Sequence, residues 1–203
     1  KQNKEMKVTI DGQSIDVEPG TTILQAARMI GGDLVPPAMC YYSKLKGSGG
    51  KCRCCLVEVS KGSEADPRPM PKLMASCVTG CMDGMEVNSK SSARVTEARK
   101  SVTEFLLINH PLDCPICDQA GECDLQNLSF EHGNPKSRFI EEKRTFEPED
   151  IGPNIQLHMN RCILCQRCVQ VADQLTDNRV HGVLDRGDHA NISTGISKAI
   201  DNE

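Results

Sequence analysis

One histidine and three cysteines fall within fourteen residues in the segment His110-Pro-Leu-Asp-Cys-Pro-Ile-Cys-Asp-Gln-Ala-Gly-Glu-Cys123. Imidazole and thiolate are ligands of structural zinc, and three cysteines with one histidine complete such a site. The same set could occupy the four iron corners of a 4Fe–4S cluster, each of which needs one terminal ligand. Zinc sites usually take two well-separated ligand pairs, whereas these four ligands surround one compact object. The set His110, Cys114, Cys117 and Cys123 therefore leaves both a zinc ion and a 4Fe–4S cluster open.

A later run, Cys162-Ile-Leu-Cys165-Gln-Arg-Cys168, has a more specific spacing. Cys-x2-Cys-x2-Cys holds three corners of a 4Fe–4S cluster in bacterial ferredoxins. A cysteine three residues later serves a second cluster in those proteins, but here that position is Ala172. The fourth ligand of the first cluster is normally a distant cysteine, and none follows Cys168. We expect a 4Fe–4S site whose fourth ligand lies beyond Glu203, comes from a partner or is absent.

The N-terminal part of the chain holds the remaining six cysteines, Cys40, Cys52, Cys54, Cys55, Cys77 and Cys81. A single cysteine, a Cys-x2-Cys pair and a later single cysteine follow one another as in plant-type 2Fe–2S sites, although the gap before the pair is longer here. The pair is spaced to bind one iron, so the two single cysteines would bind the other. Spacing alone does not separate Cys77 from Cys81 as the last ligand.

Within the pair, Cys52 and Cys55 fit the two-residue gap. Cys54 and Cys81 are most simply interpreted as buried thiols that act as small hydrophobic side chains. The stretch Gly47-Ser-Gly-Gly50 precedes the pair. Glycines allow backbone N–H groups to approach cluster sulfurs closely, which stabilises the negative charge of the cluster.

Short strands and one capped helix are predicted around the first cysteine group. Alternating apolar residues indicate a hairpin over residues 7–10 and 14–17, with Asp11-Gly12 at its turn. Thr22 and Gln25 form a capping-box pattern at the start of a helix. Further strands are expected at residues 56–59 and 73–76, separated by a proline-rich loop over residues 63–71.

A second helix is expected over residues 93–109, which places His110 at its C-terminal end. Residues 141–150 are charged and irregular, and we interpret them as a linker. A short helix over residues 169–175 follows the last cysteine run. The apolar residues of the helix over 93–109 lie on one face, formed by Val95, Ala98, Val102, Phe105 and Leu106, and Pro111 ends the helix.

The composition of the chain agrees with metal cross-links. Its 203 residues are 38% hydrophobic and only 3% aromatic, so the core must be thin for the length of the chain. The sequence shows neither a signal peptide nor a membrane-length apolar run, and its four Cys-x2-Cys pairs favour metal ligation over disulfides. The formal net charge of −4, without a basic cluster, argues against nucleic acid as a partner.

The order of these motifs resembles the N-terminal iron–sulfur region of the G subunit of NADH-quinone oxidoreductase, respiratory complex I. The resemblance runs from about Lys7 to Arg186, and its motif of one histidine and three cysteines is highly specific. It favours a 4Fe–4S cluster over zinc at that motif. The matching stretches are Cys52-Arg-Cys-Cys55, Leu73-Met-Ala-Ser-Cys77, Asn109-His-Pro-Leu-Asp-Cys-Pro-Ile-Cys117, Gly121-Glu-Cys-Asp-Leu-Gln126 and Arg161-Cys-Ile-Leu-Cys-Gln-Arg-Cys168.

This resemblance implies an α+β fold with three domains. A β-grasp 2Fe–2S ferredoxin-like domain would span residues 1–90, a small helical His/Cys 4Fe–4S domain residues 91–150, and a partial bacterial-ferredoxin-like 4Fe–4S domain residues 151–203. Cys77 rather than Cys81 would complete the 2Fe–2S site. The implied ligands are Cys40, Cys52, Cys55 and Cys77 for the 2Fe–2S cluster, His110, Cys114, Cys117 and Cys123 for one 4Fe–4S cluster, and Cys162, Cys165 and Cys168 for the other.

The function implied by the resemblance is electron transfer from NADH toward quinone, one electron at a time, within an oxidoreductase complex. No Gly-x-Gly-x-x-Gly follows a predicted strand, so NADH and flavin are expected on a partner subunit, and no quinone site is expected here. Other peripheral-arm subunits would be partners, without direct insertion into the membrane. The location would be the cytoplasmic side of a bacterial inner membrane, or the matrix side in a mitochondrion.

Two other functions remain as alternatives from the sequence. Related iron–sulfur modules occur in NAD-linked hydrogenases and in some formate dehydrogenases. A zinc-stabilised interaction protein without redox activity would also explain the cysteines, and it would be colourless where an iron–sulfur protein is brown.

Overall fold

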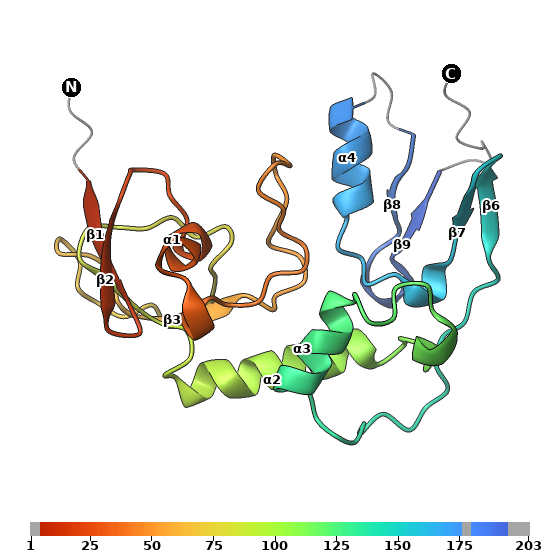
Figure 1. The fold of residues 1–203 in the computed structure, drawn as a ribbon, viewed down its shortest axis with the longest axis horizontal. Coiled ribbons are helices and arrows are strands. Elements are labelled where there is room, and N and C mark those ends of the chain that lie inside the picture. Colours follow the sequence, from red (N-terminus) through yellow and green to blue (C-terminus); the bar gives the residue numbers. More distant parts are fainter. Residues whose placement is uncertain (1–4, 176–179, 195–203) are drawn as a thin grey trace. The chain divides into compact units, whose positions relative to one another are not determined.

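The computed structural model describes residues 5–175 and 180–194, which fold into two compact units. The first unit comprises Lys1–Met39, Arg53–Glu104 and Asp124–Asn134. The second unit comprises Cys40–Cys52, Phe105–Cys123 and Pro135–Glu203. Figure 1 labels helices α1 to α4 and most of the strands.

A five-stranded mixed sheet forms the centre of the first unit, in the order β2-β1-β5-β3-β4. β1 pairs antiparallel with β2 and parallel with β5, and β3 pairs antiparallel with both β4 and β5. This topology confirms the predicted α+β class and the ferredoxin-like N-terminal part. The strands are β1 (Met6–Ile10), β2 (Gln13–Val17), β3 (Leu56–Lys61), β4 (Met74–Ala75) and β5 (Met85–Asn88).

The turn of the β1–β2 hairpin lies at Asp11-Gly12, as the sequence predicts, and it also anchors a distant segment. The Asp11 carboxylate accepts the backbone N–H groups of Ser89, Lys90 and Ser91 at 2.9 to 3.2 Å, and the Ser91 hydroxyl at 2.6 Å. Burial alone would raise the pKa of Asp11, but these hydrogen bonds outweigh it, and the pKa lies below its usual value. The carboxylate thus ties the hairpin to the segment that leads into the next helix.

Helix α1 (Ile23–Ile30) packs on the sheet. Its capping box is present, since the Thr22 hydroxyl accepts the Gln25 N–H and the Gln25 side chain accepts the Thr22 N–H at 2.8 Å. The helix and the strands share one apolar core. Its fully buried residues are Val8, Ile10, Ile23, Ala26, Ala27, Val57, Val59 and Met85.

Helix α2 (Ala93–Leu107) confirms the second predicted helix and ends two residues earlier than expected. On the apolar face identified from the sequence, Phe105 is 75% exposed. The buried residues of α2 are Val95, Arg99 and Thr103, which recur every four residues. An arginine and a threonine occupy this buried row because both form hydrogen bonds there, which the apolar pattern could not reveal.

Helix α3 (Asp124–His132) was not predicted, and it belongs to the first unit. The second unit contains two hairpins and helix α4 (Arg167–Leu175), which confirms the helix expected over residues 169–175. The predicted linker over 141–150 runs into the first of these hairpins. The strands are β6 (Glu149–Gly152), β7 (Ile155–Leu157), β8 (Gly182–Leu184) and β9 (Asn191–Ser193).

The described residues also form four short 3-10 turns: η1 (Gly32–Leu34), η2 (Cys114–Ile116), η3 (Met159–Arg161) and η4 (Gly187–His189). Two of them, η2 and η3, start or precede a cysteine motif. Over residues 5–175 and 180–194, no helix has the length and apolar character needed to cross a membrane.

Candidate metal centres

All twelve cysteines lie in the described part of the chain, and none of these twelve forms a disulfide. Within the same described residues, no three His, Cys, Asp or Glu side chains are arranged to hold a single metal ion. The four ligands of an iron–sulfur cluster are divided among two or four iron atoms, so they do not all converge on one point as the ligands of a single ion do.

In the second unit, the loop from Cys40 to Cys52 directs backbone N–H groups at a thiol. The amides of Lys51 and Cys52 each lie 3.4 Å from the Cys40 Sγ. The Lys51 ammonium donates to the carbonyl oxygens of Gly47 and Gly49, at 3.2 and 3.1 Å. N–H groups that point at a sulfur favour its thiolate form, which is the form that binds iron.

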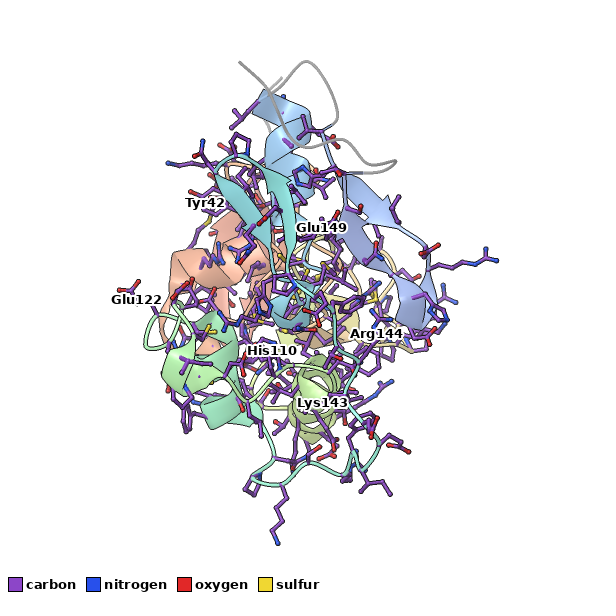
Figure 2. All side chains as sticks on the ribbon, turned by 90° about the vertical axis from the view of Figure 1, so that its right-hand side faces the viewer. Tyr42, His110, Glu122, Lys143, Arg144 and Glu149 are labelled. Atoms are coloured by element: carbon purple, nitrogen blue, oxygen red, sulfur yellow. The ribbon has the colours of Figure 1, made fainter. Side chains whose placement is uncertain are left out.

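The glycines of this loop adopt the conformation that the loop requires. Gly47, Gly49 and Gly50 all have a positive φ, between 69° and 107°, which side chains other than glycine rarely allow. The Lys46 backbone exchanges two hydrogen bonds with the Gln174 side chain of α4, at 3.1 and 3.0 Å. The loop is therefore shaped by its glycines and held by α4, within one unit; Tyr42 in Figure 2 marks its beginning.

In the first unit, the Sγ atoms of Cys55 and Cys77 lie 3.3 Å apart. Ser76 sets this distance because its N–H and its hydroxyl both donate to the Cys55 carbonyl, at 3.1 and 2.8 Å. The Ser76 carbonyl in turn accepts the N–H of Leu24 in α1, at 3.0 Å. Ser76 is fully buried, and sequence reasoning did not single it out.

Cys54 and Cys81 are buried, and so are Cys40, Cys52, Cys55 and Cys77, so burial does not separate the proposed ligands from the other two thiols. Cys81 belongs to the apolar core, and burial raises the pKa of its thiol to about 11. A thiol with that pKa stays protonated at neutral pH.

Arg99 is the second residue that the sequence analysis missed. It is 6% exposed, and burial lowers its pKa while the thiolates of Cys55 and Cys54 and the Asp11 carboxylate oppose that shift. No local signal marked it, because the burial of Val95 and Thr103, four residues before and after Arg99, is seen only in the structure.

In the second unit, His110 follows the C-terminal end of α2 and is half-buried. Burial lowers its pKa, with the cations of Lys143 and Arg161 acting in the same direction against Asp113. A neutral imidazole has the free electron pair that a metal ligand needs. The Lys143 ammonium donates to the Leu107 and Ile108 carbonyls at 3.0 and 2.8 Å, so it caps the helix beside His110; both residues are labelled in Figure 2.

The three cysteines after His110 lie on a tight loop. Cys114 begins η2. The Cys117 N–H donates to the Cys114 carbonyl at 3.4 Å, and the Ala120 N–H donates to the Cys117 carbonyl at 3.0 Å. Cys123 immediately precedes α3. All four predicted ligands of this motif thus belong to the second unit.

The loop of the last cysteine run contains two residues in the left-handed region. Leu164 has a φ of 53° and Gln166 a φ of 60°, both uncommon for residues other than glycine. This conformation points the Leu164 N–H at the Cys162 Sγ, at 3.4 Å. Burial raises the pKa of Cys162, and the neighbouring thiolates Cys165 and Cys168 add to that effect. The loop thus turns a backbone N–H toward the Cys162 thiol, as in backbone concavities that bind anions and iron–sulfur clusters.

An ion pair joins the two cysteine motifs of the second unit. The Arg161 guanidinium lies 3.4 Å from the Asp113 carboxylate, and these residues directly precede Cys162 and Cys114. A cavity of about 320 Å³, lined mainly by apolar groups, borders both His110 and Cys162. Arg144, labelled in Figure 2, and Phe146 also line it, and the Arg144 backbone N–H donates to the Asn109 side chain at 3.0 Å.

Three family models match successive parts of the chain. Residues 3–92 match a 2Fe-2S iron-sulfur cluster binding domain, residues 99–138 the NADH-ubiquinone oxidoreductase-G iron-sulfur binding region, and residues 152–203 the ferredoxin-like domain of NADH-quinone oxidoreductase subunit 3. The chain belongs to the family of the N-terminal iron–sulfur region of the NADH-quinone oxidoreductase G subunit. It contains a 2Fe–2S domain and 4Fe–4S binding regions.

Relatives of this family come from bacteria and from mitochondria. The chain is 42% identical over 198 residues to the NADH-quinone oxidoreductase G subunit of Rickettsia bellii, and 44% identical over 198 residues to the NADH-ubiquinone oxidoreductase 75 kDa subunit of Reclinomonas americana. It is 43% identical over 205 residues to the mitochondrial 78 kDa subunit of Candida albicans. These matches cover 98 to 100% of the chain but only 27% of each relative.

A solved structure supports the same fold. A chain of the NAD+-reducing [NiFe]-hydrogenase in its H2-reduced state is 30% identical, with a TM-score of 0.78. The match covers 92% of this chain and 74% of that chain.

The residues present fit iron–sulfur clusters rather than zinc. Amides directed at sulfur, in left-handed loops, suit a cluster whose sulfurs carry negative charge. When bound, such clusters accept and release single electrons.

Proposed function

We propose that this chain is an electron-transfer subunit that carries electrons from NADH, through a flavin-bearing partner, toward quinone. The observation that carries the proposal is the cysteine loop at Cys162, whose left-handed backbone points the Leu164 N–H at the Cys162 sulfur. The chain spans only about a quarter of its curated relatives, so the complex, its substrates and its membrane are inferred from those relatives.

The ligands proposed for the 2Fe–2S cluster are Cys40, Cys52, Cys55 and Cys77. The 3.3 Å between the Sγ atoms of Cys55 and Cys77 favours these two as ligands of one iron. Cys40 and Cys52 would then bind the other iron, since the Cys52 amide points at the Cys40 sulfur. This pairing differs from the one that spacing suggested, in which Cys52 and Cys55 share an iron.

The proposed ligands of the 4Fe–4S clusters lie in the second unit. His110, Cys114, Cys117 and Cys123 would hold one cluster, and Cys162, Cys165 and Cys168 would supply three ligands to the other. His110 brings no charge where the other ligands bring thiolates, and Lys143 and Arg161 place cations beside it. Both features favour a higher reduction potential for that cluster.

We also infer the setting in which the chain works. A flavin- and NADH-binding subunit would deliver electrons, and other peripheral-arm subunits would receive them. The complex would stand on the cytoplasmic side of a bacterial inner membrane, or on the matrix side in a mitochondrion.

A second candidate host is an NAD-linked hydrogenase. The 30% identity and TM-score of 0.78 to a chain of such an enzyme show that this fold also occurs there. The identities of 42 to 44% to the bacterial G subunit and its mitochondrial counterparts favour the quinone-linked complex.

The test is the iron and acid-labile sulfide content of anaerobically purified protein of this length. We expect about ten of each per chain if all three clusters assemble, and about six if the last site stays empty. Zinc without sulfide would refute electron transfer.

Two neighbouring substitutions make this test specific to the ligands. Cys55→Ser should remove about two irons per chain and the 2Fe–2S signal in electron paramagnetic resonance. Cys54→Ser is the matched control, because Cys54 is buried next to Cys55 and is not a proposed ligand. Loss of the 2Fe–2S signal in the Cys54 variant would refute the proposed ligand set.

A further inference from the structure

Arg99 holds the backbone of the chain on both sides of a proposed cluster ligand. Its Nε donates to the Cys54 carbonyl, and one Nη donates to the Leu56 carbonyl, each at 3.3 Å. These two residues directly precede and follow Cys55. The same Nη also donates to the Ser89 carbonyl at 3.3 Å, where the chain leaves β5. One planar guanidinium thus fixes the position of Cys55 from α2, 44 residues away in sequence (99 − 55).

The charge of Arg99 is buried without a carboxylate bonded to it. Among the described residues, the hydrogen bonds of its guanidinium end on carbonyl oxygens. Carbonyl dipoles satisfy the N–H groups, but they do not neutralise the positive charge. The carboxylate of Asp11, which acts on Arg99 from a greater distance, already accepts four hydrogen bonds from Ser89, Lys90 and Ser91.

A thiolate at Cys55 would be the negative charge that most strongly opposes the lowering of the Arg99 pKa by burial, and a thiolate at Cys54 would be the next. Cys54 is fully buried and is not a proposed ligand. An iron-bound Cys55 is a permanent thiolate, and a 2Fe–2S cluster with four thiolates carries a net negative charge. The buried cation therefore lacks a full partner until the cluster is bound.

We infer that Arg99 is the counter-charge of the 2Fe–2S cluster and the positioning residue for Cys55. This inference rests on the proposed function, because it requires a cluster at Cys55. Reduction adds one negative charge to the cluster, so a fixed buried cation stabilises the reduced form over the oxidised form. Arg99 accordingly raises the reduction potential of this cluster, and its loss lowers that potential.

The test compares three variants of the whole 203-residue chain, purified anaerobically with its clusters. Arg99→Gln removes the charge, and Arg99→Lys keeps the charge but loses the planar fork. Arg94→Gln is the matched control, because Arg94 lies on the same helix, is exposed, and also donates to a carbonyl, that of Pro71. The readouts are the reduction potential of the 2Fe–2S cluster, followed by electron paramagnetic resonance, and the iron content per chain.

We expect Arg99→Gln to lower the equilibrium constant for reduction of the 2Fe–2S cluster by about tenfold, which is about 59 mV for a one-electron couple. Arg99→Lys should lower the reduction potential less than Arg99→Gln does, because the positive charge remains. Its 2Fe–2S signal should be broader and its iron lost faster than in the wild-type chain, because one ammonium cannot hold both carbonyls beside Cys55. Arg94→Gln should change neither readout. If Arg99→Gln does not fold, the positioning role is tested by comparing Arg99→Lys with Arg94→Gln. A broader 2Fe–2S signal and faster loss of iron in Arg99→Lys alone would support that role, and equal behaviour of the two variants would refute it.

Two results would overturn this inference, and they differ from each other. In the first, the wild-type chain contains iron and gives a 2Fe–2S signal, but the reduction potential of that cluster is the same in Arg99→Gln. This would refute the role of Arg99 and leave the electron-transfer function standing. A wild-type chain without any 2Fe–2S signal would remove both.

Discussion

His132, the last residue of α3, is influenced by the buried charge of Arg99 within the first unit. Burial lowers the pKa of His132, Arg99 lowers it further, and Glu131 acts in the opposite direction. The net direction is downward, so the folded protein binds a proton at His132 less readily than the unfolded chain does. The unfolded state then gains protons first as the pH falls, and stability decreases with it.

We therefore predict that His132→Gln flattens the pH dependence of the unfolding midpoint below about pH 6.5, the ordinary pKa of histidine. In the wild-type chain the midpoint should fall as the pH drops through that range, and the fall should be smaller in the variant. Thermal unfolding followed by circular dichroism at several pH values measures this. His189→Gln, at an exposed histidine, is the control. An identical slope in the His132 variant and the wild-type chain would contradict the prediction.

The residue types of the ligands could be predicted from the sequence, but their supporting residues could not. Cysteines and His110 stand out because their chemistry and spacing are local properties of the chain. Arg99 and Ser76 act on Cys55 through contacts that span 44 and 21 residues, as their sequence numbers give (99 − 55 and 76 − 55). An arginine in a helix is otherwise most often a solvated charge, so nothing local distinguished Arg99.

At the scale of elements, the loop at Cys162 depends on two left-handed residues that are not glycine. Such a residue costs roughly 1–2 kcal/mol, and more where the side chain branches at Cβ. The loop keeps Leu164 and Gln166 in this conformation, which places the Leu164 amide at the Cys162 sulfur. The strain is therefore part of the geometry that holds the thiols together.

We predict that Gln166→Val reduces iron content by about four per chain, because a side chain branched at Cβ opposes the left-handed conformation. Gln166→Gly should keep the iron, since glycine adopts that conformation without strain. Ile163→Val is a control at a neighbouring position outside the left-handed region. The prediction is tested by measuring the iron content of the three purified variants. Equal iron content in Gln166→Val and Gln166→Gly would rule out the role of the left-handed loop conformation.

The elements that were predicted correctly carry strong local signals. The β1–β2 hairpin has alternation and an Asp-Gly turn, and α1 has a capping box. Strand β5 and helix α3 were missed. β5 is a four-residue strand that pairs parallel with β1 from 75 residues away (85 − 10), so its position is set by the sheet rather than by its own sequence. α3 is short and mixes polar with apolar residues.

Across the whole molecule, apolar packing is unevenly shared between the two units. The connected apolar core belongs entirely to the first unit. In the described part of the second unit, the buried apolar side chains other than cysteine are Ile151, Val169, Ala172 and Ile192. A unit with so few buried groups depends on cross-links for its stability, as the low aromatic content suggested.

We predict that removal of iron leaves the first unit folded and loosens the second. In hydrogen exchange followed by mass spectrometry, chelated protein should lose protection in α4 and in the hairpins β6–β7 and β8–β9. Protection in β1, β3 and the buried face of α1 should remain. Uniform loss over both units, or no loss in either, would contradict this division. The protein with its clusters, handled identically, is the control.

The four hydrogen bonds on Asp11 also bear on the chemical ageing of the protein. Among aspartate dipeptides, Asp-Gly is the most prone to cyclise, by attack of the glycine amide nitrogen on the aspartate side chain, and to rearrange to isoaspartate, which inserts an extra carbon into the backbone. The carboxylate must be protonated and free to rotate for that reaction. Here it is held by three backbone amides and one hydroxyl and its pKa is lowered, so both requirements are opposed. The turn that joins β1 to β2 can therefore keep a reactive sequence for the lifetime of the folded chain.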